Sequence, residues 1–171
     1  MAKACDNTSG GILIRKGEDI LMIERKKNNF GMALPAGHLD GDTSGAGTAR
    51  ELDEETGLIA DELTLRVEKI LPNPCKRDGG THHAWSIFEA THWHGDVRPS
   101  ESEVKSYFWA SPQKIKELSK KLEDFAREKK IRLIEDNLPS LVKETNEDPS
   151  WISHPGLEPP MYFLFKELKI I

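Results

Sequence analysis

The stretch from Gly37 to Leu58, GHLDGDTSGAGTARELDEETGL, constrains this chain most, because it joins a glycine-rich loop to an acidic helix. Residues three and four apart share one face of a helix, so Glu51 lies beside Glu54 and Glu55, and Arg50 reaches Glu54. Packed carboxylates repel one another and raise each other's pKa unless a hard cation lies between their oxygens. A solvated acidic face is the alternative, but the preceding loop and the glycine stop signal favour a divalent-metal site.

This stretch resembles the signature of the Nudix hydrolases, GX5EX7REUXEEXGU, in which U is a bulky aliphatic residue. The second half of that signature is complete, with Arg50, Glu51, Leu52, Glu54, Glu55, Gly57 and Leu58 in the demanded positions. The first half departs, because Asp42 stands where the family has its first Glu and Gly37 is then one residue too close. Since Asp42 still supplies a carboxylate, we expect the shorter loop to alter the geometry without removing the metal site.

The resemblance implies an α/β protein with the Nudix fold, an α/β/α sandwich around a mixed β-sheet, and the flanking strand order fits over residues 8–118. Apolar alternation predicts strands at residues 11–15, 19–24, 30–35, 63–71, 83–92 and 104–109, with a hairpin at 16–18 and loops at 72–80 and 95–102. A helix is predicted over residues 46–56, although Gly47 weakens that prediction. A second helix is predicted to open at Ser111-Pro112, with Ser as N-cap and Pro in the first turn.

Composition is consistent with one compact domain. The chain has 171 residues, of which 31% are charged, and a mean hydropathy of -0.56. No apolar run approaches the ~18 residues of a membrane span, and no signal peptide is recognisable, so we expect a cytoplasmic protein without a membrane partner. The net charge of -5 argues against a nucleic-acid partner, and the two cysteines are expected to be free and reduced.

Residues 131–171 extend beyond the predicted Nudix core of residues 1–130. This segment contains Trp151, Tyr162, Phe163 and Phe165, which make it too apolar for a disordered tail. No change in composition marks a second domain. We therefore expect a C-terminal helical extension that packs on the core or completes a homodimer interface.

The resemblance implies metal-dependent hydrolysis of a diphosphate linkage in a nucleoside diphosphate derivative. A metal that bridges phosphate oxygens neutralises charge and lowers the pKa of bound water. By the same resemblance the cofactor is Mg²⁺ or Mn²⁺, and its ligands are Glu51, Glu54, Glu55 and the carbonyl oxygen of Ala36. Arg50 is expected to orient the carboxylates. The alternative is a surface ion pair, which is worth only ~0.3–0.5 kcal/mol and would not require the glycine-rich loop and acidic helix around it.

The general base is expected outside the signature, where the family often places it on a loop before the last strand. Glu101 and Glu103 occupy such a loop, in the sequence SESEV. The alternative interpretation, that both are solvent-exposed glutamates without a catalytic role, fits the sequence equally well. There are three candidate substrate-binding residues. His38 follows Gly37, the first glycine of the signature; Phe30 could stack on a base; and His83 could contact a base or a sugar. His82, His83, His92 and His94 are a poor match to zinc-site spacings, because they lack a cysteine partner and helical spacing.

The substrate class follows only from the resemblance. The context LPAGHLDGD, the HHAWSIFEA strand and the acidic loop before YFW are similar to members that cleave nucleoside triphosphates to the monophosphate and pyrophosphate. An ADP-ribose or sugar-nucleotide pyrophosphatase is the alternative. A non-catalytic nucleotide-sensing module is the alternative of another class, which the complete Arg50, Glu51, Glu54 and Glu55 set disfavours.

Overall fold

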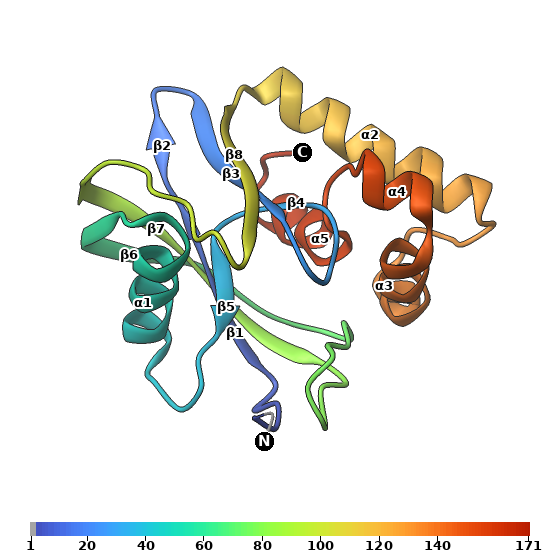
Figure 1. Ribbon diagram of the computed structural model, residues 1–171, viewed down its shortest axis with the longest axis horizontal. Coiled ribbons are helices and arrows are strands. Elements are labelled where there is room, and N and C mark those ends of the chain that lie inside the picture. Colours follow the sequence, from blue (N-terminus) through green and yellow to red (C-terminus); the bar gives the residue numbers. More distant parts are fainter. Residues whose placement is uncertain (1–2) are drawn as a thin grey trace.

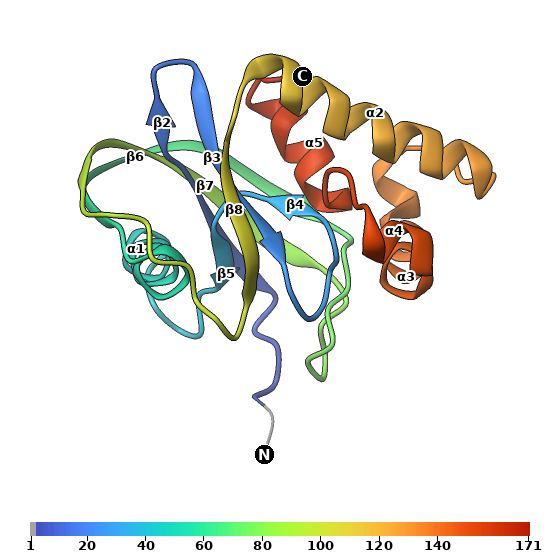
Figure 2. The same ribbon diagram turned by 45° about the horizontal axis from the view of Figure 1, so that its top comes forward.

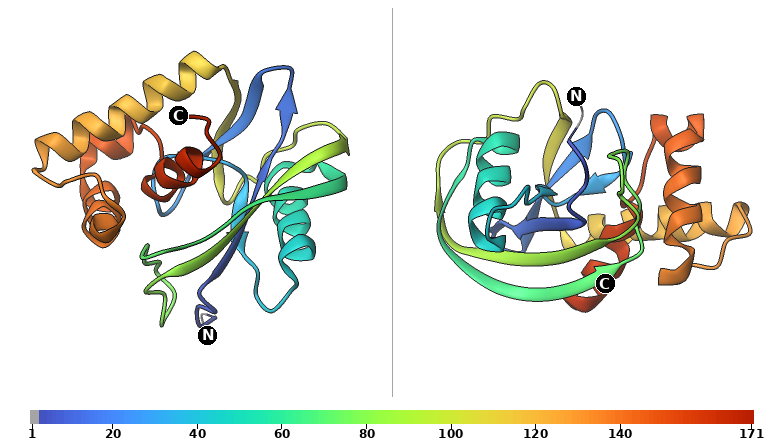
Figure 3. Two further views of the ribbon diagram at one scale, coloured as in Figure 1. Left: turned by 180° about the vertical axis from the view of Figure 1, so that it is seen from behind. Right: turned by 90° about the horizontal axis from the view of Figure 1, so that it is seen from below.

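Strand β1 (Thr8–Leu13) is central to a mixed sheet in the computed structural model, which describes residues 3–171. The strand order is β5-β1-β7-β6, with β5 (Ala36–His38), β7 (His83–His94) and β6 (Ile59–Leu71). β1 is parallel to β7 and antiparallel to β5, and β6 pairs antiparallel with β7. The predicted mixed sheet is thus confirmed, and Figure 3 shows the long β6–β7 pair curving along one side of the molecule.

A second, antiparallel sheet that the sequence did not predict is built on β3 (Asp19–Arg25). β3 pairs with β2 (Arg15–Lys16) through the predicted hairpin, with β4 (Met32–Ala33) and with β8 (Val104–Ala110). The strand predicted over residues 30–35 is shorter in the structure, where β4 covers only Met32–Ala33, and the strand that follows it, β5, belongs to the other sheet. Pro35 lies between them, and a proline has no N–H to donate to a ladder.

Helix α1 (Ser44–Thr56) begins two residues before its predicted start and carries the acidic stretch. Thr43 caps its N-terminus by accepting a hydrogen bond from the Ala46 amide, and Gly57 ends it with a left-handed φ of 75°. Gly47 is tolerated because α1 packs closely on the loop beneath it. A Cβ at this position would lie 2.8 Å from Leu39 Cδ2.

The remaining helices lie on the opposite side of the sheets from α1 (Figures 1 and 2). They are α2 (Pro112–Glu128), the short 3₁₀ helix η1 (Glu135–Asn137), α3 (Leu138–Glu147), α4 (Pro149–Ser153) and α5 (Pro159–Glu167). This layering agrees with the predicted α/β/α sandwich. Within residues 3–171, none of the helices is long and apolar enough to cross a membrane.

The C-terminal segment shares its hydrophobic core with the sheets. Trp151 and Phe165 are 3% and 0% exposed, and they belong to the same cluster as Leu13 of β1. Backbone hydrogen bonds also fix the segment to β4, because the Met32 amide donates to Gly156 (2.8 Å) and the Glu158 amide donates to Met32 (2.9 Å). The aromatic side chains of this segment are therefore covered within one chain.

Candidate active site

Helix α1 and strand β5 form one wall of a cleft of about 430 Å³. Glu51, Glu54 and Glu55 all line it from α1, as the helical spacing predicts. Glu51 and Glu55 are buried, whereas the side chain of Glu54 is 57% exposed. One wall of the cleft is therefore lined by three carboxylates, which we call the acidic wall, and two of the three are shielded from bulk water.

Arg50 holds the carboxylates of Glu51 and Glu54 in place. Its guanidinium donates to Glu51 Oε1 (2.9 Å), Glu54 Oε2 (3.3 Å), Asp42 Oδ2 (2.9 Å) and the His38 carbonyl (3.1 Å). The hydrogen bond with Asp42, followed by the charge of Glu51, raises the pKa of Arg50. The shorter loop thus still places a carboxylate, that of Asp42, on Arg50.

Gly37 is required by the close approach of β5 to the acidic helix. A Cβ at this position would lie 2.2 Å from Glu51 Oε2, well inside any real contact distance. Only glycine leaves room for the Glu51 carboxylate beside the strand.

Glu55 is the most buried of the three carboxylates of the acidic wall. Its Oε2 accepts from the Ala36 amide (2.9 Å), and its Oε1 accepts from Arg25 Nη1 (3.1 Å). Burial raises the pKa of Glu55 to about 7 against the opposing charge of Arg25, and burial likewise raises the pKa of Glu51 against that of Arg50. Both carboxylates would gain from a further cation in the cleft.

Arg25 was missed by the sequence analysis, as was its second partner, Glu158. Arg25 Nη2 donates to the Ala36 carbonyl (3.2 Å), and Arg25 Nε donates to Glu158 Oε2 (3.3 Å). Glu158 lies 133 residues along the chain and has no local motif, so only the fold brings the two side chains together. The C-terminal segment thereby contacts a residue that supports Glu55.

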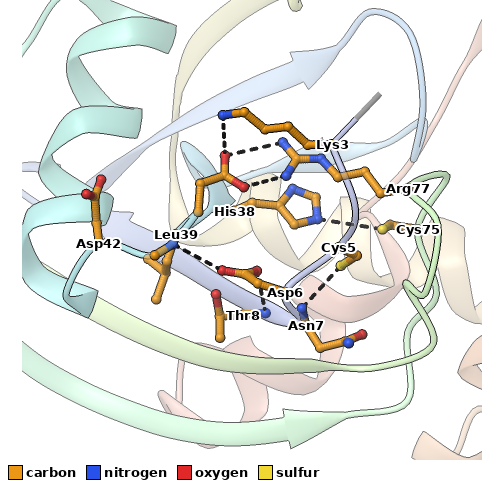
Figure 4. Close-up of polar contacts among 12 residues, drawn as sticks. Lys3, Cys5, Asp6, Asn7, Thr8, His38, Leu39, Asp42, Cys75 and Arg77 are labelled. Atoms are coloured by element: carbon orange, nitrogen blue, oxygen red, sulfur yellow. Dashed lines mark hydrogen bonds and ion pairs between the residues drawn. The ribbon is translucent and has the colours of Figure 1, made fainter. Parts of the chain in front are cut away.

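Positively charged side chains share the cleft with the carboxylates. Lys3, Lys27 and Arg77 line it together with Arg25 and Arg50. Figure 4 shows Lys3 and Arg77 meeting at one carboxylate beside His38, and this carboxylate belongs to Asp40. The sequence did not predict Lys3 and Arg77 either, because they lie outside the signature, in the segments that precede β1 and β7.

Of the remaining predicted residues, some line the cleft and others do not. Glu103 lines the cleft, whereas the Glu101 carbonyl accepts from Lys26 Nζ (2.6 Å) and Glu101 is not among the lining residues. His38 lines the cleft, but His83 is 2% exposed and lines only a smaller adjoining cavity. Phe30 packs against the main core and accepts a hydrogen bond from Trp151 Nε1 (2.7 Å) at its carbonyl.

The other histidines considered for zinc do not converge. His92 lies 3.4 Å from Glu62, His94 lies 2.8 Å from Asp61, and His82 lies 3.0 Å from the Thr81 hydroxyl. Among the residues that the structure describes, His83 alone of that group lies in a cluster of at least three side chains that could ligate one metal ion, and the other members are Cys5, His38 and Cys75.

The donor set of the cleft fits a hard divalent cation. All its candidate ligands are oxygens, from Glu51, Glu54, Glu55 and the Ala36 carbonyl, and oxygen is the donor that Mg²⁺ and Mn²⁺ prefer. Each Glu55 oxygen accepts one hydrogen bond and keeps a second lone pair. Such a cleft, on an α/β fold and with carboxylates and cationic side chains together, has the groups that metal-assisted phosphate chemistry requires.

The family model of the NUDIX domain matches residues 7–133, which is most of the chain. The chain therefore belongs to the Nudix hydrolases, which act on nucleoside diphosphate derivatives and generally need divalent metal ions. This confirms the resemblance and the enzyme class predicted from the acidic stretch.

Solved structures of the family share the fold. A MutT Nudix hydrolase from Burkholderia pseudomallei is 22% identical, with a TM-score of 0.55 over 63% of this chain and 84% of that one. A MutT protein from Methanosarcina mazei is 24% identical, with a TM-score of 0.54 over 67% of this chain and 83% of that one. No sequence among the curated proteins matches this chain.

Proposed function

We propose that this protein hydrolyses nucleoside triphosphates to the monophosphate and pyrophosphate, with Mg²⁺ or Mn²⁺ as cofactor. One observation carries the proposal. The cleft that presents Glu51, Glu54 and Glu55 is also lined by Lys3, Lys27 and Arg77. A polyphosphate can then meet a metal on the acidic wall and ammonium or guanidinium groups elsewhere in the same cleft.

The residues of the cleft divide the work. Glu51, Glu54, Glu55 and the Ala36 carbonyl would hold the metal, which when bound neutralises phosphate charge and lowers the pKa of a coordinated water. Arg50 keeps the carboxylates in their rotamers through its hydrogen bonds with Glu51 and Glu54.

Glu103 is the candidate general base, because it lines the cleft and Glu101 does not. Its carboxylate would accept the proton of the attacking water. His38 lines the cleft beside the cationic side chains. If Glu103 is the base, Glu103→Gln should lower kcat much more than Glu101→Gln does.

The charge of the cleft favours a triphosphate over ADP-ribose or a sugar nucleotide. A triphosphate carries more negative charge than a diphosphate diester, and Lys3, Lys27 and Arg77 supply cations in addition to the metal. Asp40 neutralises part of this charge through its pairs with Lys3 and Arg77, which leaves Lys27 as the cleft lysine outside that network.

A substrate panel tests the proposal. The protein is incubated with Mg²⁺ and each of the nucleoside triphosphates, ADP-ribose and several sugar nucleotides, and the products are separated and identified. We expect monophosphate and pyrophosphate from at least one triphosphate at a higher kcat/KM than any diphosphate diester gives. Preferential cleavage of ADP-ribose would support the alternative substrate, and binding without turnover across the panel would support the nucleotide-sensing module.

Two further expectations stay predictions. A homodimer is tested by light scattering of the purified chain, and a cytoplasmic location is tested by fractionation of cells that express it.

A further inference from the structure

Four side chains with nitrogen or sulfur donors converge beside the cleft. Cys5 precedes β1, His38 ends β5, Cys75 lies in the loop between β6 and β7, and His83 begins β7. One ligating atom from each lies within 4.8 Å of every other, and neither cysteine is in a disulfide. Figure 4 shows the Cys75 sulfur directed at the His38 ring, with the Cys5 sulfur close by.

Three of the six distances among these atoms are close to those that a tetrahedral zinc imposes, and the other three are within 4.8 Å. Zinc lies about 2.3 Å from thiolate sulfur and about 2.0–2.1 Å from imidazole nitrogen, which at tetrahedral angles gives about 3.4 Å between two nitrogens and about 3.6 Å between nitrogen and sulfur. His38 Nε2 and His83 Nε2 are 3.4 Å apart. Cys75 Sγ lies 3.6 Å from His38 Nε2, and Cys5 Sγ lies 3.4 Å from His83 Nε2.

We propose that Cys5, His38, Cys75 and His83 bind one structural zinc ion, distinct from the catalytic metal of the cleft. Two thiolates and two imidazoles form a complete zinc coordination set and a poor one for Mg²⁺, which prefers oxygen. This site does not depend on the proposed substrate, because it uses none of the carboxylates of the acidic wall, and of its four ligating residues only His38 lines the cleft.

Groups outside the four ligands are arranged to support them. His83 Nδ1 lies 2.7 Å from the Asn73 carbonyl oxygen, which places the ring proton on Nδ1 and leaves the Nε2 lone pair facing the other three ligands. The Asn7 amide donates to Cys5 Sγ (3.3 Å), as a backbone amide does to a metal-bound thiolate. Asn73 is held in turn by Trp85, whose Nε1 donates to Asn73 Oδ1 (3.1 Å).

The loop that carries Cys75 is shaped around its sulfur. Gly80 leaves the space that the thiol occupies, since a Cβ there would lie 2.3 Å from Cys75 Sγ and 3.4 Å from Cys5 Cβ. The Cys75 amide donates to the Gly80 carbonyl (2.9 Å), and the Cys5 amide donates to the Asp78 carbonyl (2.8 Å). The N-terminal segment and this loop are therefore already joined in the geometry that a shared ion needs.

The zinc would also position the cationic side of the cleft. Lys3 is two residues before Cys5, and Arg77 is two residues after Cys75. Both line the cleft, and both pair with Asp40. An ion that fixes the two cysteines thus fixes the backbone from which these two cations reach the substrate.

Metal analysis of the full chain, purified without chelators, tests this proposal. We expect one zinc per chain after exhaustive dialysis, falling to near zero in Cys5→Ser and Cys75→Ser. His82→Asn is the matched control, because His82 is the exposed neighbour of His83 and should keep the zinc. Glu55→Gln should also keep the zinc, which separates this site from the acidic wall of the cleft.

Exchange of the wild-type protein into Co²⁺ keeps the test independent of whether the cysteine variants fold. A tetrahedral site with two thiolates should give a sulfur-to-cobalt charge-transfer band together with strong visible d–d absorption, and zinc should displace both. Absence of zinc from the wild type together with absence of the charge-transfer band would overturn the proposal. So would a Cys5–Cys75 disulfide in freshly purified protein, or full zinc content in both cysteine variants.

Discussion

Replacing Phe165 with alanine tests whether the C-terminal segment folds as one unit with the sheets. Phe165 is fully buried in the cluster that also contains Leu13 and Met22, so truncation removes apolar contacts from both parts and leaves a cavity. Truncation of a buried phenylalanine costs ~3–5 kcal/mol, which for a chain of this size corresponds to a fall in Tm of about 6–20 °C. Both the sheets and the C-terminal helices should lose stability together.

The assay is urea unfolding followed in parallel by tryptophan fluorescence and far-ultraviolet circular dichroism. We expect a single transition by both probes, moved to lower urea with little change in slope. Ile134→Ala is the control, because Ile134 is 37% exposed and should cost at most about 1 kcal/mol. Two separate transitions, or a loss for Phe165→Ala no larger than that of the control, would refute the shared core.

Three further predictions follow from the cleft. Gly37→Ala should reduce Mg²⁺-dependent turnover at least about tenfold, because the new Cβ displaces the Glu51 carboxylate that helps to hold the metal. Gly45→Ala is the control, because its Cβ would meet nothing closer than 4.0 Å, and equal kinetics of the two variants would contradict the close approach. Arg25→Met should lower the free energy of unfolding in urea by about 3–5 kcal/mol, because the buried carboxylates of Glu55 and Glu158 lose their cation. Glu158→Gln should lower it by less, because Arg25 keeps Glu55 as a partner, and the reverse order would count against the network of these three residues. Without added Mg²⁺, the stability of the wild type relative to Glu55→Gln should fall as pH rises from about 4.5 to about 7, because the folded chain with its raised Glu55 pKa binds more protons at that site than the unfolded chain does. The comparison with Glu55→Gln cancels the opposite trend of His38 and His83, whose pKa values burial lowers. Urea midpoints of both proteins across that window measure the difference, which saturating Mg²⁺ should flatten, and a rise of the wild type relative to the variant would show the sign to be wrong.

Local patterns in the sequence predicted most of the elements that build the cleft. The acidic helix was predictable because its spacing and its glycine stop signal lie within about twenty residues, a range in which side-chain periodicity determines the outcome. Strand β5 was not, because its three residues are too few to show a strand pattern and only their pairing with β1 defines them. Pro35 ends the strand predicted over residues 30–35, and β4 ends two residues before it.

Contacts between distant segments were the part that the sequence did not reveal. Arg25 and Glu158 meet only because the C-terminal segment adds to β4, and neither residue lies in a recognisable motif. Cys5 and Cys75 were predicted to be free thiols, and the histidines were compared only with one another. The convergence of both cysteines with His38 and His83 depends on the register of β1, β5 and β7, which no local pattern specifies.

The central claim is that the α1 carboxylates hold the metal for diphosphate hydrolysis, and steady-state kinetics with and without Mg²⁺ test it most directly. On the best substrate of the panel, Glu55→Gln should lower kcat/KM by about 10²-fold or more, the equivalent of losing several kcal/mol of transition-state stabilisation by a metal. Glu62→Gln, a change at an exposed glutamate of β6, should match the wild type. Mg²⁺-dependent turnover that is as fast in folded Glu55→Gln as in the wild type would contradict the account.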